Sequence, residues 1–145
     1  MRELVQDRIR DSIRVKESLL TQADLLVEMA RVVIDCIRGG GKVVFFGNGG
    51  SAADAQHMAA ELSGRFYLDR PALPALSLST NSSALTAIGN DYGFEHVFAR
   101  QLPGVGARGD VAFAISTSGS SANVLEATRL AKQIGMITIG FTGRQ

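Results

Sequence analysis

The sequence predicts an α/β fold in which a parallel, doubly wound sheet lies between two layers of helices. From residue 42 onward, short apolar segments alternate with segments of helical periodicity. The strand-like segments are apolar throughout, which is typical of strands buried on both faces. Three of them are followed by polar turns, at residues 47–51, 80–83 and 116–121. Such turns gather at the carboxyl edge of a parallel sheet, where ligands bind, so we expect the functional site there.

Length and composition indicate a globular protein that fits one domain over residues 1–145. The chain has 15 basic and 14 acidic residues and 46% hydrophobic residues. It has no basic block and no apolar run long enough to span a bilayer, so we expect neither a nucleic-acid surface nor a membrane segment. The first residues lack the apolar region of a signal peptide, and the single cysteine, Cys36, cannot form an internal disulfide. Both features predict a cytoplasmic protein.

Two amphipathic helices are predicted before the sheet. Apolar residues recur at near-helical spacing from Leu4 to Leu20, and again, more regularly, from Leu25 to Ile37. The three glycines at 39–41 end the second helix. Because the first helix precedes the α/β unit, we expect residues 1–40 to take part in packing against another subunit and residues 41–145 to form the sheet unit.

Four strands and four helices are predicted in the rest of the chain. The predicted strands cover residues 42–46, 75–79, 111–115 and 136–141. The predicted helices cover residues 52–62, a short segment ending at 88, 94–101 and 122–133. The glycines within 89–93 are expected to separate the second of these helices from the third.

The turn at residues 116–121 (STSGSS) has the composition of an anion site. It joins a predicted strand to a predicted helix, whose first N–H groups and dipole attract negative charge. It contains no lysine, so it is not a P-loop, and its hydroxyls suit a sugar phosphate. The alternative is an ordinary strand–helix connection in which a serine caps the helix. The number of hydroxyls favours the anion site.

The turn after the first predicted strand formally matches a dinucleotide-binding motif. Residues 47–52 (GNGGSA) fit G-x-G-x-x-[GA]. A dinucleotide site also needs an acidic residue at the end of the next strand, and that strand ends in Ser-Leu-Ser-Thr. A dinucleotide-binding oxidoreductase is therefore a minor alternative. Glycines that let backbone amides and Asn48 approach a small polar ligand are a sufficient explanation.

His57 and Glu61 lie four residues apart on one face of a predicted helix. The carboxylate suits a general base, and the pair suits a divalent metal. The alternative is a surface pair without function, and spacing alone slightly favours this alternative. Arg65 follows the helix and suits either a phosphate contact or solvent. His96 is given no functional role.

Together these motifs resemble one family closely. The segments GNGGSAADAQHMAAELSGRF and STSGSSANV and the pair Asn90-Asp91 are similar to the sugar isomerase (SIS) domain of the phosphoheptose isomerases, and the resemblance covers essentially all 145 residues. It implies a three-layer α/β/α fold. It also implies an aldose–ketose isomerase that converts D-sedoheptulose 7-phosphate into D-glycero-D-manno-heptose 7-phosphate, the first step toward nucleotide-activated heptose for bacterial lipopolysaccharide. Members are cytoplasmic homotetramers with sites between subunits.

The resemblance also implies roles for individual residues. Glu61 corresponds to the catalytic glutamate, and His57 with Glu61 to half of a zinc site found in some members. Contacts to the phosphorylated seven-carbon sugar are implied for Asn48, Gly49, Gly50, Arg65, Asn90, Asp91, Ser116, Thr117, Ser118 and Ser121. In the family a C-terminal helix carries a glutamine and a histidine that complete the metal site and supply the acid–base partner. That helix is not among these 145 residues, so we expect the protein to continue beyond Gln145.

Two other functions are compatible with the same fold. One is a non-catalytic tetramer that binds a partner such as a replication initiator protein; such relatives tend to lack the glutamate, so Glu61 favours the enzyme. The other is a sensor that binds a sugar phosphate without turnover. Incubation with sedoheptulose 7-phosphate distinguishes these functions, because only the isomerase produces an aldose.

Overall fold

The structure is a computed structural model and describes residues 1–143. The chain divides into two compact units, Met1–Val32 and Val33–Gln145. Three helical elements open the chain: α1 (Arg2–Ser18), a 3₁₀ turn η1 (Leu19–Gln22) and α2 (Ala23–Arg38), which runs from the first unit into the second. The two predicted N-terminal helices are therefore present. No helix among residues 1–143 combines the length and apolar character needed to cross a membrane.

Helix α1 is amphipathic and has no buried residue. Its apolar side chains Leu4, Val5, Ile9 and Ile13 are between 50% and 57% exposed. Ion pairs between side chains three residues apart stabilise its polar face, as between Arg10 and Asp7 at 2.8 Å. Exposed pairs of this kind contribute only a few tenths of a kcal/mol each, roughly 0.3–0.5. An apolar stripe this exposed marks a surface suited to burial against a partner.

The second unit contains a four-stranded parallel sheet in the order β2-β1-β3-β4. The strands are β1 (Val43–Gly47), β2 (Ala75–Ser77), β3 (Val111–Ser116) and β4 (Ile137–Thr142). The central strands β1 and β3 are buried along their whole length. All four predicted strands are present, and the predicted fold class is confirmed.

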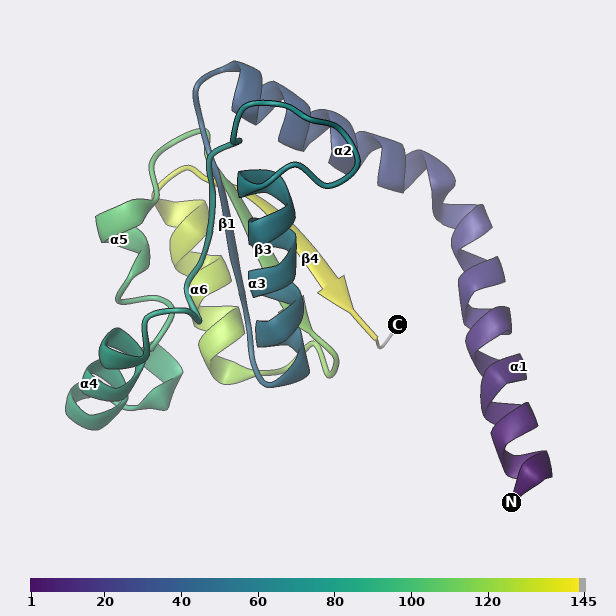
Figure 1. Cartoon of the computed structure of the whole chain (residues 1–145). Coiled ribbons are helices and arrows are strands. Elements are labelled where there is room, and N and C mark those ends of the chain that lie inside the picture. Colours follow the sequence, from purple (N-terminus) through teal and green to yellow (C-terminus); the bar gives the residue numbers. More distant parts are fainter. Residues whose placement is uncertain (144–145) are drawn as a thin grey trace. The chain divides into compact units, whose positions relative to one another are not determined.

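Helices cover both faces of the sheet (Figure 1). α3 (Gly50–Ser63) crosses from β1 to β2, and α6 (Ala122–Gln133) crosses from β3 to β4 in the opposite direction along the sheet. Right-handed crossovers in opposite directions place their helices on opposite faces. The connection from β2 to β3 contains α4 (Ser82–Tyr92), a 3₁₀ turn η2 (Phe94–His96) and α5 (Leu102–Val105), and it packs on the same face as α6.

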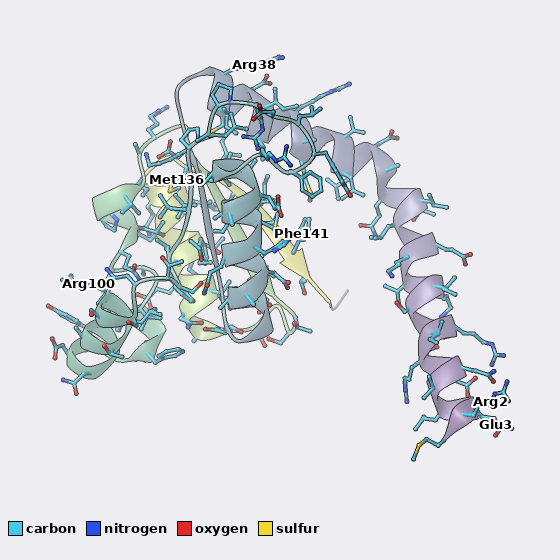
Figure 2. All side chains as sticks on the ribbon, in the orientation of Figure 1. Arg2, Glu3, Arg38, Arg100, Met136 and Phe141 are labelled. Atoms are coloured by element: carbon cyan, nitrogen blue, oxygen red, sulfur yellow. The ribbon has the colours of Figure 1, made fainter. Side chains whose placement is uncertain are left out.

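The alternation of side chains along the strands divides the core in two. Val44 and Phe46 of β1 pack with Phe98, Leu102 and residues of α6 on one face. On the other face, Phe45 and Phe113 lie 5.2 Å apart and Phe113 and Phe141 4.8 Å apart, measured between ring centroids. Phe141 extends this aromatic row to the edge strand β4 (Figure 2), where it is 41% exposed.

Two predicted boundaries in the connection from β2 to β3 are wrong. α4 continues through Gly89 and ends at Tyr92, where Gly93 stops it with a φ of 98°, so residues 89–93 do not break the helix where expected. The side chain of Asn81 caps the start of α4 by accepting a hydrogen bond from the Ala84 N–H at 3.0 Å, which stabilises the helix despite its internal glycine.

The helix predicted at 94–101 is instead the 3₁₀ turn η2 followed by further turns. The physical reason is burial. Val97, Phe98 and Ala99 are all at most 5% exposed, and three consecutive residues cannot all lie on the single buried face of an amphipathic helix. Arg100 follows them, and its guanidinium stacks on the Tyr92 ring at 4.3 Å from the ring centroid, which ties the end of this segment back to α4.

Candidate active site

Hydroxyl groups gather at the carboxyl end of β3, between that strand and α6. Ser116 Oγ lies 3.1 Å from Ser121 Oγ and 3.5 Å from Ser118 Oγ. The hydroxyl and the N–H of Ser120 donate to Ser118 Oγ at 3.1 and 3.2 Å. These four residues form the serine cluster. Gly119 makes the turn possible with a φ of 68°, and Thr117 is exposed beside it.

The serine cluster stands in front of the N-terminus of α6, whose N-cap residue makes no side-chain capping bond. Ser121 is the N-cap residue of α6, yet its hydroxyl does not bond to the helix backbone and lies instead beside Ser116. The side-chain capping bond expected of an ordinary connection is therefore not formed by Ser121. The first N–H groups of a helix have no intrahelical acceptor, and the helix dipole adds positive potential there. Hydroxyl donors and helix N–H groups at one place suit a phosphate group.

The turn after β1 approaches the serine cluster closely. A Cβ atom on Gly47 would lie 2.7 Å from the Ile115 carbonyl oxygen, so only glycine lets the ends of β1 and β3 come this near. Asn48 follows, and its side-chain amide pairs reciprocally with that of Asn123 at 2.8 and 2.9 Å. Gly49 and Gly50 start α3 and are exposed. The turn after β1 is thus joined directly to the start of α6, just after the turn at residues 116–121.

The predicted catalytic and metal-binding pair is present on α3. His57 Nε2 lies 3.5 Å from Glu61 Oε1, and the two side chains are 73% and 37% exposed. At about 1.5 Å of rise per residue, Glu61 lies roughly 16 Å along α3 from Gly50, away from the carboxyl edge. Among residues 1–143, no hydrogen bond or ion pair joins this pair to the serine cluster. One protomer therefore does not bring these two groups of residues into contact.

The same pair could supply two ligands to a zinc ion, because imidazole nitrogen and carboxylate oxygen are both zinc ligands and lie close enough here to share one ion. A zinc site needs at least three protein ligands. The described part of the chain contains no group of three or more histidine, cysteine, aspartate or glutamate side chains placed to hold a metal. His57 and Glu61 fit as half of such a site.

Arg65 and Arg70 follow α3 and differ in their surroundings. Arg65 is exposed, and its side chain forms no hydrogen bond or ion pair within residues 1–143. The Arg70 guanidinium donates to the carbonyl oxygens of Glu61 at 2.9 Å and Leu62 at 2.8 Å, and also to those of Gly64 and Pro71. Arg70 therefore fixes the end of the helix that carries Glu61.

Asn90 and Asp91 lie in the last turn of α4, where Asn90 Nδ2 donates to Asp91 Oδ1 at 2.8 Å. Both are exposed. Neither makes a hydrogen bond to the serine cluster or to the pair on α3 within the described residues. Like Arg65, this pair is exposed and can meet a ligand.

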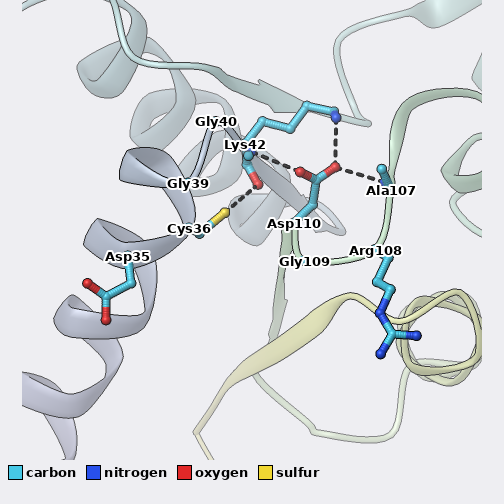
Figure 3. Close-up of a pocket in the computed structure, with 10 residues that line it drawn as sticks. Asp35, Cys36, Gly39, Gly40, Lys42, Ala107, Arg108, Gly109 and Asp110 are labelled. Atoms are coloured by element: carbon cyan, nitrogen blue, oxygen red, sulfur yellow. Dashed lines mark hydrogen bonds and ion pairs between the residues drawn. The ribbon is translucent and has the colours of Figure 1, made fainter.

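A pocket of about 350 Å³ lies at the opposite, amino edge of the sheet (Figure 3). Asp110 dominates it: its carboxylate accepts hydrogen bonds from the Lys42 N–H at 3.0 Å and the Ala107 N–H at 2.8 Å and pairs with Lys42 Nζ at 2.6 Å. Burial raises the pKa of Asp110, but these interactions with Lys42 and Ala107 outweigh burial and hold its pKa below the ordinary value. Burial also raises the pKa of the Cys36 thiol, which donates to the Lys42 carbonyl at 3.4 Å. The network is a structural clamp, and we assign it no catalytic role.

Sequence reasoning missed three residues that the structure brings into or beside the site: Ser120, Arg70 and Asn123. Asn123 could have been found, because Ala127 and Ala131 follow it at four-residue spacing and share its buried helix face. A polar residue in such a row must have a partner. No sequence pattern could have identified Arg70, because its hydrogen-bond acceptors are backbone carbonyl oxygens.

Comparison with known proteins gives a consistent result. The sequence model of the SIS domain matches residues 9–143. The phosphoheptose isomerase of Desulfovibrio desulfuricans is 52% identical over 143 residues, which cover 98% of this chain and 68% of that protein. The phosphoheptose isomerase of Aneurinibacillus thermoaerophilus is 49% identical over 146 residues, covering 99% and 74%.

Solved structures agree with these sequence relatives. The phosphoheptose isomerase of Neisseria gonorrhoeae superimposes with a TM-score of 0.93 at 46% identity, covering 99% of this chain and 76% of that one. The phosphoheptose isomerase of Francisella tularensis also gives a TM-score of 0.93, at 34% identity, covering 97% and 74%.

Proposed function

This chain belongs to the SIS domain family, and we infer from its phosphoheptose isomerase relatives that it is an aldose–ketose isomerase acting on sedoheptulose 7-phosphate. The product is D-glycero-D-manno-heptose 7-phosphate. The observation that carries this inference in the structure is the serine cluster, whose hydroxyls converge in front of the N-terminus of α6, where the N-cap residue makes no capping bond. That arrangement suits the phosphate monoester that substrate and product share.

We propose that the two ends of the substrate are bound by different groups. The phosphate binds at Ser116, Thr117, Ser118 and Ser121 and at the first N–H groups of α6. The sugar hydroxyls bind along Asn48, Gly49, Gly50, Asn90 and Asp91, which offer amide, backbone and carboxylate groups. Arg65 supports the phosphate or the sugar from the end of α3, since its guanidinium is exposed and has no side-chain partner within residues 1–143.

We propose that Glu61 is the base of an enediol mechanism. Its carboxylate removes a proton from C1, next to the ketone at C2, while the C2 oxygen gains a proton, which gives a cis-enediol. The C1 hydroxyl then loses a proton to become the aldehyde, which balances the proton gained by the C2 oxygen, and Glu61 returns the first proton to C2. An acid–base group of this kind contributes about 10²–10⁴ in rate. The exposure of Glu61, 37%, leaves it accessible to a substrate.

We propose that His57 and Glu61 contribute two ligands to a divalent ion, zinc in the first instance. Such an ion polarises a carbonyl or hydroxyl oxygen and so favours the enediol. The chemistry of this donor set supports the proposal.

The assembly is proposed to be a homotetramer with sites between subunits. The exposed apolar stripe of α1 supports an oligomer, and the separation of Glu61 from the serine cluster supports sites shared between copies. We further propose a cytoplasmic location, which fits the free, buried Cys36. We also propose that the reaction is the first step toward nucleotide-activated heptose.

The decisive experiment replaces Glu61 with glutamine. Glu61→Gln keeps the size and shape of the side chain but replaces the basic carboxylate with a non-basic amide. We expect kcat to fall by about 10²-fold or more. Binding of sedoheptulose 7-phosphate, measured by calorimetry, should stay within a few-fold of the wild type, because the serine cluster is intact.

Glu126→Gln is the matched control. Glu126 is also 37% exposed and also contacts a histidine, with Oε1 2.7 Å from His96 Nδ1, but it lies outside the proposed site. Its variant should isomerise at the wild-type rate. Full activity of Glu61→Gln would refute the assignment of the base, and a wild-type protein that binds the sugar phosphate without producing an aldose would identify a sensor.

A further inference from the structure

The side-chain amides of Asn48 and Asn123 form a closed pair between two turns of the carboxyl edge. Asn48 Nδ2 donates to Asn123 Oδ1 at 2.8 Å, and Asn123 Nδ2 donates to Asn48 Oδ1 at 2.9 Å. Asn48 follows β1, and Asn123 is the second residue of α6, directly after the serine cluster. This pair is the direct side-chain link between the turn after β1 and the start of α6 within the described residues.

A backbone group fixes the orientation of this pair. The N–H of Val124 donates to Asn123 Oδ1 at 2.9 Å. A backbone N–H can only donate, so the atom facing it must be the oxygen of the Asn123 amide and not the nitrogen. The orientation of Asn123 then dictates that of Asn48: Nδ2 faces Asn123 Oδ1, and Oδ1 faces Asn123 Nδ2. The free donor and acceptor positions of Asn48 are thereby set as well.

The two asparagines differ in exposure, and the difference separates their roles. Asn123 is 4% exposed and cannot reach a ligand, whereas Asn48 is only partly buried. Each amide has two N–H groups and an oxygen with two lone pairs. After pairing, Asn48 keeps one N–H and one lone pair, and these are available at the site. The Asn123 Oδ1 atom accepts hydrogen bonds from Asn48 Nδ2 and from the Val124 N–H, which uses both of its lone pairs.

We propose that Asn123 is a positioning residue that orients the Asn48 amide toward the sugar and holds the sugar-binding turn against the phosphate-binding turn. The proposal rests on the proposed function, because it takes Asn48 as a contact of the substrate. Asn123 therefore affects substrate binding through Asn48, at the sugar end. The hydroxyls of the serine cluster bond among themselves and do not depend on Asn123 for their placement.

A double-mutant cycle tests the proposal. Asn48→Ala, Asn123→Ala and the double variant are compared with the wild type by kcat/KM for sedoheptulose 7-phosphate and by inhibition with inorganic phosphate. If Asn123 acts through Asn48, each single variant loses about tenfold or more in kcat/KM, and the double variant loses no more than Asn48→Ala alone. The inhibition constant for phosphate should stay within about twofold in Asn123→Ala, since the phosphate contacts remain.

Thr128→Val is the control on the same helix. It removes one side-chain hydrogen bond, from Thr128 Oγ1 to the Val124 carbonyl at 2.7 Å, and should leave kcat/KM unchanged. Should Asn123→Ala fail to fold, Asn123→Asp replaces it. The aspartate keeps the size of the side chain and its bond from Val124 but cannot donate to Asn48 Oδ1, so kcat/KM should again fall about tenfold.

Three results would overturn the proposal: full activity of Asn123→Ala, losses in the two single variants that multiply in the double variant, or full activity of Asn48→Ala. Each of them is distinct from failure of the proposed function. That failure would appear as a wild-type protein that does not isomerise the heptose phosphate at all, and it would be seen before any variant is made.

Discussion

At the scale of single residues, the best-defined interaction lies far from the proposed site. The Asp110 carboxylate is 3% exposed and joins the start of β1 to the start of β3 through Lys42 and Ala107. Three donors converge on it, one of them a charged amine. Hydrogen bonds to a charged group contribute about 1.5–3 kcal/mol each, so this clamp stabilises the amino edge of the sheet.

Asp110 gives the protein a predictable sensitivity to acid. Its pKa is lowered in the folded state, so its contribution to stability is present above the ordinary carboxyl pKa of about 3.9 and is lost as pH falls through the lower folded-state pKa. Asp110→Asn cannot titrate. We expect the variant to be about 2 kcal/mol less stable than the wild type near neutral pH, and the difference to shrink in strong acid.

Urea unfolding at one fixed protein concentration, at neutral pH and at a pH of about 3, measures both effects. Asp35→Asn is the control, because Asp35 lines the same pocket but is exposed, and its side chain has no partner within residues 1–143. It should match the wild type at both pH values. A difference between Asp110→Asn and the wild type that persists unchanged in acid would show that packing, and not the charge of Asp110, is responsible.

At the scale of elements, α3 depends on a side chain outside it. The last carbonyls of a helix have no intrahelical donors, and Arg70 supplies several at once from the following loop. Its positive charge also complements the negative end of the helix dipole. Glu61 lies in this last part of α3, so Arg70 holds the backbone of the proposed base in place.

Arg70→Lys tests this dependence. It keeps the charge but replaces the planar fork with a single amine that cannot serve several carbonyls at once. We expect a loss of about 1–2 kcal/mol in stability and a fall in kcat, because Glu61 becomes less well placed. Arg38→Lys, in the last turn of α2, is the control and should change neither. If Arg70→Lys is less stable than the wild type but keeps the wild-type kcat, Arg70 stabilises the fold and does not position Glu61.

The elements also show what the sequence could and could not predict. The four strands, α2, α3 and α6 follow from apolar periodicity and from glycines at their ends. The start of α4 was also predicted, but its end and the segment from Phe94 to Val105 were not. In that segment, tertiary burial of three consecutive residues, Val97 to Ala99, overrides the local pattern. The serine turn was evident from composition alone. Its reciprocal link through Asn123 was not, since the partners are 75 residues apart.

At the scale of the whole molecule, the proposed site is divided. The serine cluster lies at the carboxyl edge, while Glu61 lies roughly 16 Å along a helix on the opposite face of the sheet from α6. If the serine cluster binds the phosphate and Glu61 transfers protons at C1 and C2 of the same substrate, the two groups must lie in one site. We propose that a symmetric oligomer brings them together by pairing the serine cluster of one copy with Glu61 of another.

Subunit complementation tests this arrangement directly. Glu61→Gln retains the serine cluster, and the double variant Ser118→Ala, Ser121→Ala retains Glu61. Each alone should be nearly inactive. When the two are coexpressed with different tags and mixed oligomers are purified, random pairing leaves about a quarter of shared sites with both groups intact, so activity should recover to about that fraction of the wild type. Simply mixing the two separately purified proteins provides the baseline. Mixed oligomers that remain as inactive as their parents would show that each site is built from a single chain, and the position of Glu61 would then exclude it as the base.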